Sequence, residues 1–125
     1  MNELVWIYMI NAAMLSVHEM DSAYWHEWDL FGLKGGINGF LVIHIPLFVL
    51  IFYGFWMLIE TNVIGFCISL LLAVCGIGAF VIHMTFLRKG HHGFDTFVSK
   101  TILSSILIVS IVQGVLTLLN WNTCC

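Results

Sequence analysis

Charged residues are scarce in this chain of 125 residues, where they make up 9% of the sequence, against the roughly 25% typical of soluble domains. Hydrophobic residues make up 61%, and the mean hydropathy is +1.02. This balance excludes a soluble globular domain and predicts an integral membrane protein. Only four residues are Lys or Arg and the net charge is −3, so the chain lacks an extended basic surface and we expect no nucleic-acid partner.

Several sequence signals of other protein classes are missing. The N-terminal stretch lacks the basic region and the small-residue cleavage site of a removable signal peptide, so we interpret it as a retained first helix. The cysteines show no zinc-finger spacing. The alternating pattern of a membrane β-barrel is also absent, which leaves helices as the elements that would cross a bilayer with their backbone hydrogen bonds satisfied.

Four long apolar segments dominate the sequence, separated by short polar connections. A membrane-spanning helix needs about 20 predominantly apolar residues, and each segment is long enough. We therefore predict an all-α fold, an integral membrane four-helix transmembrane bundle that forms a single domain over residues 1–125. The helices are expected at about 4–28, 37–59, 62–87 and 94–119.

The basic residues indicate an orientation in the membrane. Lys34 lies in the first connection, Arg88 and Lys89 lie in the third, and Lys100 lies near the start of the fourth predicted helix. In a four-helix bundle these positions all fall on one side. By the positive-inside rule that side is cytoplasmic, which places both termini outside the cytoplasm.

Ionisable side chains gather in the same, cytoplasmic half of the predicted bundle. An ionisable group inside the hydrocarbon costs on the order of 2.5 to 3.5 kcal/mol, so it normally faces the bundle interior and marks a functional site. All six histidines and five of the seven acidic residues fall in this half. They are His18, His26, His44, His83, His91 and His92, with Glu19, Asp21, Glu27, Asp29 and Asp95.

The types and spacing of these residues predict a metal site. Imidazole and carboxylate groups from several helices suit zinc, iron or manganese, and helix bundles are a recurrent frame for such sites. His18 and Asp21 are three residues apart on one helical face, whereas Glu27 is expected to point away from them. The expected metal ligands are His18, Asp21, His44 and His83, with His91 and His92 as further ligands.

Two acidic residues are the candidates for catalysis beside such a metal. Glu19 and Asp95 are expected to act as a general base or to supply further ligands. A metal-bound water is a nucleophile near neutral pH, whereas iron would favour oxygen chemistry. The sequence therefore predicts a membrane-embedded metalloenzyme, a hydrolase or an oxidoreductase, that acts on a lipid or another membrane-soluble substrate at the cytoplasmic leaflet.

Other interpretations of the same residues stay open. The polar groups would also serve as a metal-free network that fixes helix packing, and His44 and His83 would suit a haem held between two helices. A non-catalytic membrane subunit, or a small carrier of protons or ions, is the alternative function. Such a protein would associate with a second copy of itself or with a partner membrane protein. The H-E-x-x-H motif of zinc proteases is absent, because Ser22 stands where its second histidine belongs.

The stretches "HEMD", "HEW", "F" and "HIPLF" resemble the pattern of an uncharacterised family of small four-helix bacterial integral membrane proteins. The family pattern is H-E-x-D, then E-W and F, then H-x-P. The resemblance implies the four-helix fold and a bacterial inner-membrane location, and it implies no activity. His26 departs from the pattern, in which a basic residue stands at that position, so we do not expect it to be a ligand. The matching residues are His18, Glu19, Asp21, Glu27, Trp28, Phe31, His44 and Pro46.

Overall fold

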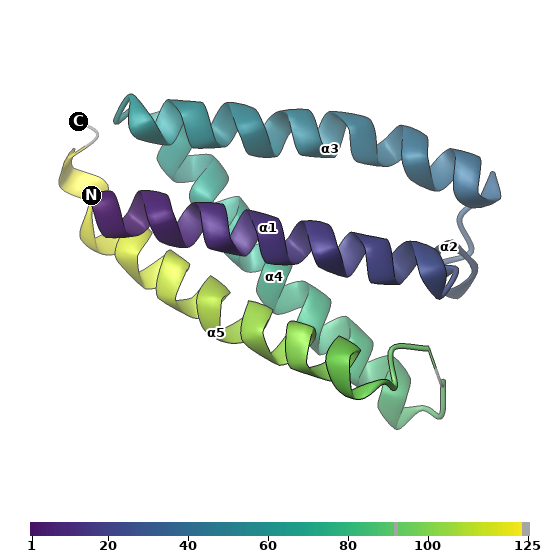
Figure 1. Cartoon of the computed structure of the whole chain (residues 1–125). Coiled ribbons are helices and arrows are strands. Elements are labelled where there is room, and N and C mark those ends of the chain that lie inside the picture. The colour runs from purple at the N-terminus through teal and green to yellow at the C-terminus, as the bar shows by residue number, and fades with distance from the viewer. Residues whose placement is uncertain (92, 124–125) are drawn as a thin grey trace.

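A computed structural model describes residues 1–91 and 93–123, and these residues form helices and connections without a strand. The all-helical prediction is confirmed, but the described residues form five α-helices where four were predicted. Figure 1 shows their order along the chain. The elements are α1 (Asn2–Tyr24), α2 (Glu27–Leu30), α3 (Gly36–Ile59), α4 (Val63–Arg88), α5 (Phe97–Leu119) and a short 3-10 helix, η1 (Trp121–Thr123).

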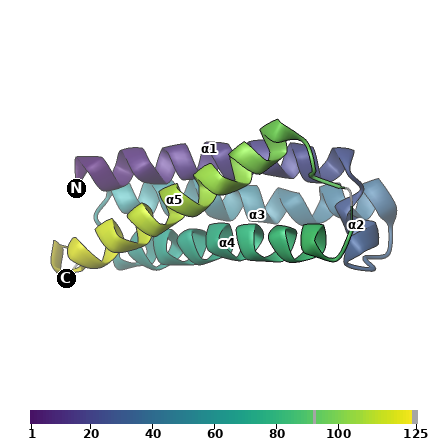
Figure 2. The same ribbon diagram turned by 90° about the horizontal axis from the view of Figure 1, so that it is seen from below.

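The four long helices run in alternating directions, in the up-down-up-down order of a simple bundle (Figures 1 and 2). The start of α1, η1 and the α3–α4 turn lie at one end of the bundle, which we call the terminal end. The short helix α2 and the α4–α5 connection lie at the opposite end, which we call the α2 end. All four Lys and Arg residues therefore lie at the α2 end, as the sequence indicated.

Three helices, α3, α4 and α5, are long and apolar enough to cross a membrane, with 24, 26 and 23 residues. No other helix in the described part of the chain meets this condition, whereas the sequence predicted four such helices. The exception is α1, which has 23 residues but carries polar side chains along its length, including Asn11, His18, Glu19 and Asp21. Of these side chains, Asn11 and His18 are buried inside the bundle, and Glu19 and Asp21 are partly buried.

The first predicted helix is interrupted. α1 ends at Tyr24, and His26 adopts a left-handed conformation with φ of 54° before α2 begins. This conformation costs a non-glycine residue roughly 1–2 kcal/mol. The buried ring of Trp28 on α2 packs on Phe40 of α3, with ring centroids 5.6 Å apart, and this packing offsets the cost. The break turns α2 back across the end of the bundle.

The last long helix begins later than predicted. The sequence placed its start near residue 94, but α5 begins at Phe97, because the hydroxyl of Thr96 accepts a hydrogen bond from the Ser99 backbone N–H and caps the helix. Phe94 lies outside the helix in a left-handed conformation with φ of 65°, and its side chain is buried. Its ring thereby reaches the histidines of α1 and α4.

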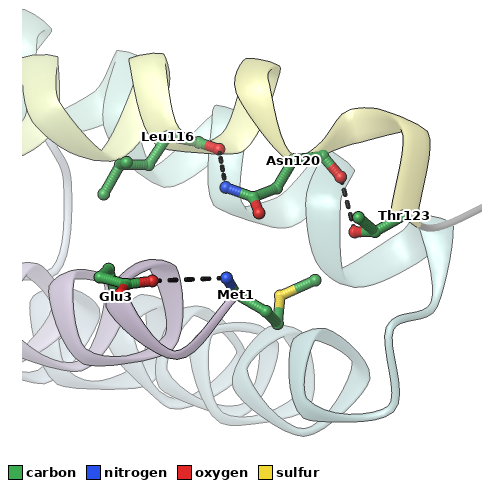
Figure 3. Close-up of polar contacts among 5 residues, drawn as sticks. All are labelled: Met1, Glu3, Leu116, Asn120 and Thr123. Carbon is green, nitrogen blue, oxygen red and sulfur yellow. Dashed lines mark hydrogen bonds and ion pairs between the residues drawn. The ribbon is translucent and has the colours of Figure 1, made fainter.

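The terminal end is closed by local contacts and by the hydrophobic core. Figure 3 shows the first residue beside the end of α5: the Met1 ammonium lies 3.4 Å from Glu3 Oε2, and Asn120 donates a hydrogen bond to the Leu116 carbonyl oxygen. Leu4 and Tyr8 of α1 are fully buried in the core cluster that fills this half of the bundle. Glu3 and Glu60 are the acidic residues at this end, and the other five acids and all the histidines lie in the sequence toward the α2 end.

Candidate functional site

The first imidazole–carboxylate pair joins α3 to α1. His44 Nε2 lies 2.7 Å from Glu19 Oε2, and His44 Nδ1 lies 2.6 Å from the carbonyl oxygen of Phe40. Because a carbonyl oxygen only accepts hydrogen bonds, Nδ1 carries a proton. A second proton must then lie between Nε2 and the carboxylate, on one or the other, since two bare acceptors at this distance would repel. Glu19 and His44 therefore share one transferable proton.

The second pair joins α2 to α4. His83 Nε2 lies 3.2 Å from Glu27 Oε1, and the two side chains are 2% and 12% exposed. Burial raises the pKa of the Glu27 carboxyl, but its interactions with the His83 ring and the Ser22 hydroxyl outweigh burial and hold that pKa below its ordinary value. The prediction that Glu27 points away from the site is wrong, because the break at His26 turns α2 inward.

His18 lies against this second pair. Its ring meets the His83 ring edge to face, with centroids 4.7 Å apart, and Phe94 covers both rings at 5.8 Å and 4.2 Å. Four buried side-chain atoms in this region have no hydrogen-bond partner within 3.5 Å and with good geometry: Nδ1 of His18, Nδ1 of His83, Oδ2 of Asp21 and the hydroxyl oxygen of Ser22. A buried polar atom without a partner costs about 1–3 kcal/mol, so a cluster of them is a candidate site for a ligand.

The carboxylates of both pairs line one pocket at the α2 end. It has a volume of about 190 Å³ and lies between α1, α2 and α3, with Glu19, Glu27 and His44 among its walls. Trp28 and Phe31 also line it. These five residues belong to the eight that match the motif described above, although they come from three separate helices and a connection. We call this cavity the polar pocket.

Two apolar cavities lie along the contact between α1 and α3. One, of about 280 Å³, includes Tyr8, Ser16 and Phe48 in its walls, and the other, of about 250 Å³, includes Ser16, Phe48 and Glu19. They share wall residues and therefore lie next to each other, and the second also has walls on α4; we call this row of two cavities the α1/α3 seam. Glu19 lines both the seam and the polar pocket, so its carboxylate lies between them.

A separate polar network occupies the terminal half of the bundle. Asn11 donates to Gln113 Oε1 at 2.7 Å, and Gln113 donates to the backbone and side-chain oxygens of Ser69 at 3.0 Å. These groups satisfy one another across α1, α4 and α5, which is the pattern of a packing network. Buried Leu15 lies one turn beyond Asn11 toward the α2 end, and buried Ile106 lies two turns from Gln113 in the same direction, so apolar side chains lie between this network and the histidines.

The other predicted site residues lie away from the polar pocket. Asp95 is half exposed and pairs with Lys100, and His91 is exposed and packs edge to face on Phe86 at 5.5 Å. His26, which was not expected to be a ligand, is exposed and stacks on Trp28, a wall residue of the polar pocket. His92 lies outside the described residues.

The structure brings the expected metal ligands only partly together. His18 and His83 are in contact, but His44 is paired with Glu19, and Asp21 Oδ1 accepts a hydrogen bond from the Trp25 indole N–H. Over residues 1–91 and 93–123, no group of three or more His, Cys, Asp or Glu side chains is placed to hold a metal ion.

One comparison with known proteins gives a match. The model of a family of unknown function (DUF6713) matches residues 4–120. No curated protein and no solved structure matches the chain.

Proposed function

The chain belongs to this family of unknown function, which supplies no activity, and we propose from the site itself that it is a membrane-embedded acid–base enzyme acting on a lipid or another membrane-soluble molecule. The single observation that carries the proposal is the α1/α3 seam, two neighbouring apolar cavities of which one has the paired carboxylate of Glu19 in its wall. An apolar substrate lying in the seam would present its end to a transferable proton.

The chemistry of the site fits proton transfer. In the Glu19–His44 pair an imidazole nitrogen lies 2.7 Å from a carboxylate oxygen, a distance that a shared proton would bridge, and the Phe40 carbonyl fixes the orientation of the ring. A group oriented in this way works as a general acid or base. Glu27 lines the same pocket and is itself paired with His83, so a second acid–base group lies within the same cavity. One pair would remove a proton from the substrate and the other would return one.

We also propose a location, an inner membrane with the α2 end on the cytoplasmic side. α3, α4 and α5 would cross a bacterial inner membrane, and α1 would cross with them as the polar member of the bundle. All four Lys and Arg residues lie at the α2 end, which supports a cytoplasmic position for that end and for the polar pocket. Both termini would then lie outside the cytoplasm.

Solvent deuterium tests the proposal. Purified protein is reconstituted with a membrane lipid extract in deuterated water, and the lipids are analysed by mass spectrometry. A base that removes a substrate proton and an acid that returns a deuteron leave the product one mass unit heavier. We expect at least one lipid species to gain deuterium with the wild-type protein and not with Glu19→Gln. The matched control is Glu3→Gln, an exposed acid at the terminal end, which should keep activity.

Two results would contradict acid–base catalysis at this site. One is an extract in which no species gains deuterium in the presence of folded wild-type protein. The other is deuterium gain that persists unchanged in Glu19→Gln. Circular dichroism of both variants confirms that their helices are intact.

A transition metal is the second candidate, and the unpaired atoms beside Phe94 favour it. Nδ1 of His18, Nδ1 of His83 and Oδ2 of Asp21 are ligand types for zinc, iron or manganese. Elemental mass spectrometry of the purified protein tests this candidate, with an absorption spectrum to detect haem. Near-stoichiometric metal that falls in His18→Ala but not in the exposed control His26→Ala would support it, whereas folded, metal-free wild-type protein would exclude it.

The remaining alternatives have less support. A haem between His44 and His83 would require both rings to give up the carboxylates that their Nε2 atoms now meet. A carrier of protons or ions would need a polar path through the bundle, but buried Leu15 and Ile106 separate the two polar clusters. In a non-catalytic subunit, the apolar cavities of the seam and the Glu19–His44 pair would have no function.

A further inference from the structure

A third polar region lies at the α2 end, between the end of α4 and the start of α5, and the proposed function does not use it. It is a cavity of about 500 Å³, which we call the α4/α5 groove. Its charged walls are Arg88, His91, Asp95 and Lys100. The polar pocket, by contrast, is lined by residues of α1, α2, α3 and the connection between the last two, so the two cavities have no wall in common.

The charge of the groove is positive. Arg88 and Lys100 are permanent cations, and the one acid in the walls, Asp95, pairs with Lys100. One positive charge therefore remains even when His91 is neutral. The guanidinium of Arg88 offers a planar set of N–H donors that matches the oxygens of a phosphate, and Lys100 adds a mobile ammonium. The part of the groove between Arg88 and Lys100, which we call its mouth, thus suits a phosphate group.

The other wall of the groove is apolar. Phe80, Met84 and Leu87 are spaced four and three residues apart, so they lie on one face of α4. Phe80 precedes Arg88 by eight residues, which is about 12 Å along a helix. The groove therefore runs from a cationic mouth at the helix ends to an apolar wall on a helix that is long and apolar enough to cross a membrane.

We propose that the α4/α5 groove binds an anionic phospholipid, with its phosphate between Arg88 and Lys100 and an acyl chain along Phe80 and Met84. Basic pockets between helices at the cytoplasmic face of membrane proteins are a known means of holding such head groups. A free phosphate would use the mouth alone, so the apolar wall favours the lipid. The proposal is independent of the acid–base function, because it uses other residues and another face of the bundle.

Native mass spectrometry of the whole protein in detergent tests this site. Phosphatidylglycerol or phosphatidylcholine is added at equal concentration, and the lipid-bound fractions are compared. We expect several-fold more bound phosphatidylglycerol, and loss of that preference in the double variant Arg88→Gln, Lys100→Gln. The matched control is Lys34→Gln, Lys89→Gln, which removes two positive charges from the same end of the bundle at exposed residues that do not line the groove.

Each outcome decides the proposal. An intact preference in the control together with its loss in the groove variant would support the α4/α5 groove as the site. Equal loss in both variants would overturn it, because the lipid would then respond only to overall charge. Equal binding of the two lipids by the wild-type protein would also overturn it. Complete displacement of bound phosphatidylglycerol by millimolar inorganic phosphate would overturn the proposed role of the apolar wall, because the phosphate group alone would then account for binding.

Discussion

The contact between α4 and α5 depends on the absence of a side chain at Gly76. A β-carbon built there would overlap the hydroxyl oxygen of Ser110 and would lie 3.1 Å from Cγ2 of Ile106. Gly78, two residues farther along the same helix, has no atom within 4 Å of the position that a β-carbon would take. The variants Gly76→Ala and Gly78→Ala therefore make the same chemical change in the same helix, one in a close contact and one in open space.

The expected difference follows from two effects. Replacing a helical glycine by alanine stabilises a helix by about 0.8–1.0 kcal/mol, and this gain applies to both variants. Forcing an extra carbon into a well-packed contact costs typically 1–3 kcal/mol, and this applies to Gly76→Ala alone. The overlap would also move the Ser110 hydroxyl, which accepts a hydrogen bond from Asn11 at 3.0 Å. We expect Gly76→Ala to be about 1–3 kcal/mol less stable than Gly78→Ala.

Reversible unfolding in mixed detergent micelles, followed by circular dichroism, measures the two free energies of unfolding. The double variant Gly76→Ala, Ser110→Ala removes the overlapping oxygen and should recover part of the loss. Equal free energies for Gly76→Ala and Gly78→Ala would refute the reasoning, because they would show that α4 and α5 do not pack through this glycine.

Three further substitutions test the α2 end and the polar network. Trp28→Ala should cost about 3–5 kcal/mol of unfolding free energy because Trp28 is 9% exposed, whereas Trp6→Ala, at 62% exposed, should cost far less in the same assay. His26→Gly should leave stability equal or higher, since glycine adopts the left-handed conformation without strain; thermal unfolding in detergent checks this, and a clear loss would contradict the turn. Gln113→Ala should cost about 1–3 kcal/mol, because it leaves the Asn11 amide and Ser69 short of partners; a neutral result in the unfolding assay would contradict a buried network.

Much of the fold follows from the sequence. Long apolar segments predict the four long helices, and short connections predict their alternating directions. The stop after Tyr24 was not predictable from local signals, because no glycine or proline lies between Ser22 and Trp28. The turn at His26 exists because Trp28 finds a buried position against Phe40, a contact between elements that the sequence does not display.

The sequence predicted which end of the bundle holds the candidate site, but it did not predict how the side chains pair there. His18, His83, His44 and Glu19 do face the interior at the α2 end, as a bundle with buried ionisable groups requires. Glu27 was missed because helical periodicity was extended through a break. Its place in the "EW" stretch of the motif was the available signal.

The polarity of α1 depends on the other three long helices. Asn11, His18 and Ser22 are buried at intervals of seven and four residues, so they form one stripe along α1 that faces α4 and α5. An isolated α1 would expose this stripe to lipid, at a cost for each polar group that its partners in the bundle remove. The scarcity of charge elsewhere has the same explanation: α3, α4 and α5 supply an apolar exterior, and α1, α2 and α3 carry the ionisable groups of the polar pocket, Glu19, Glu27 and His44.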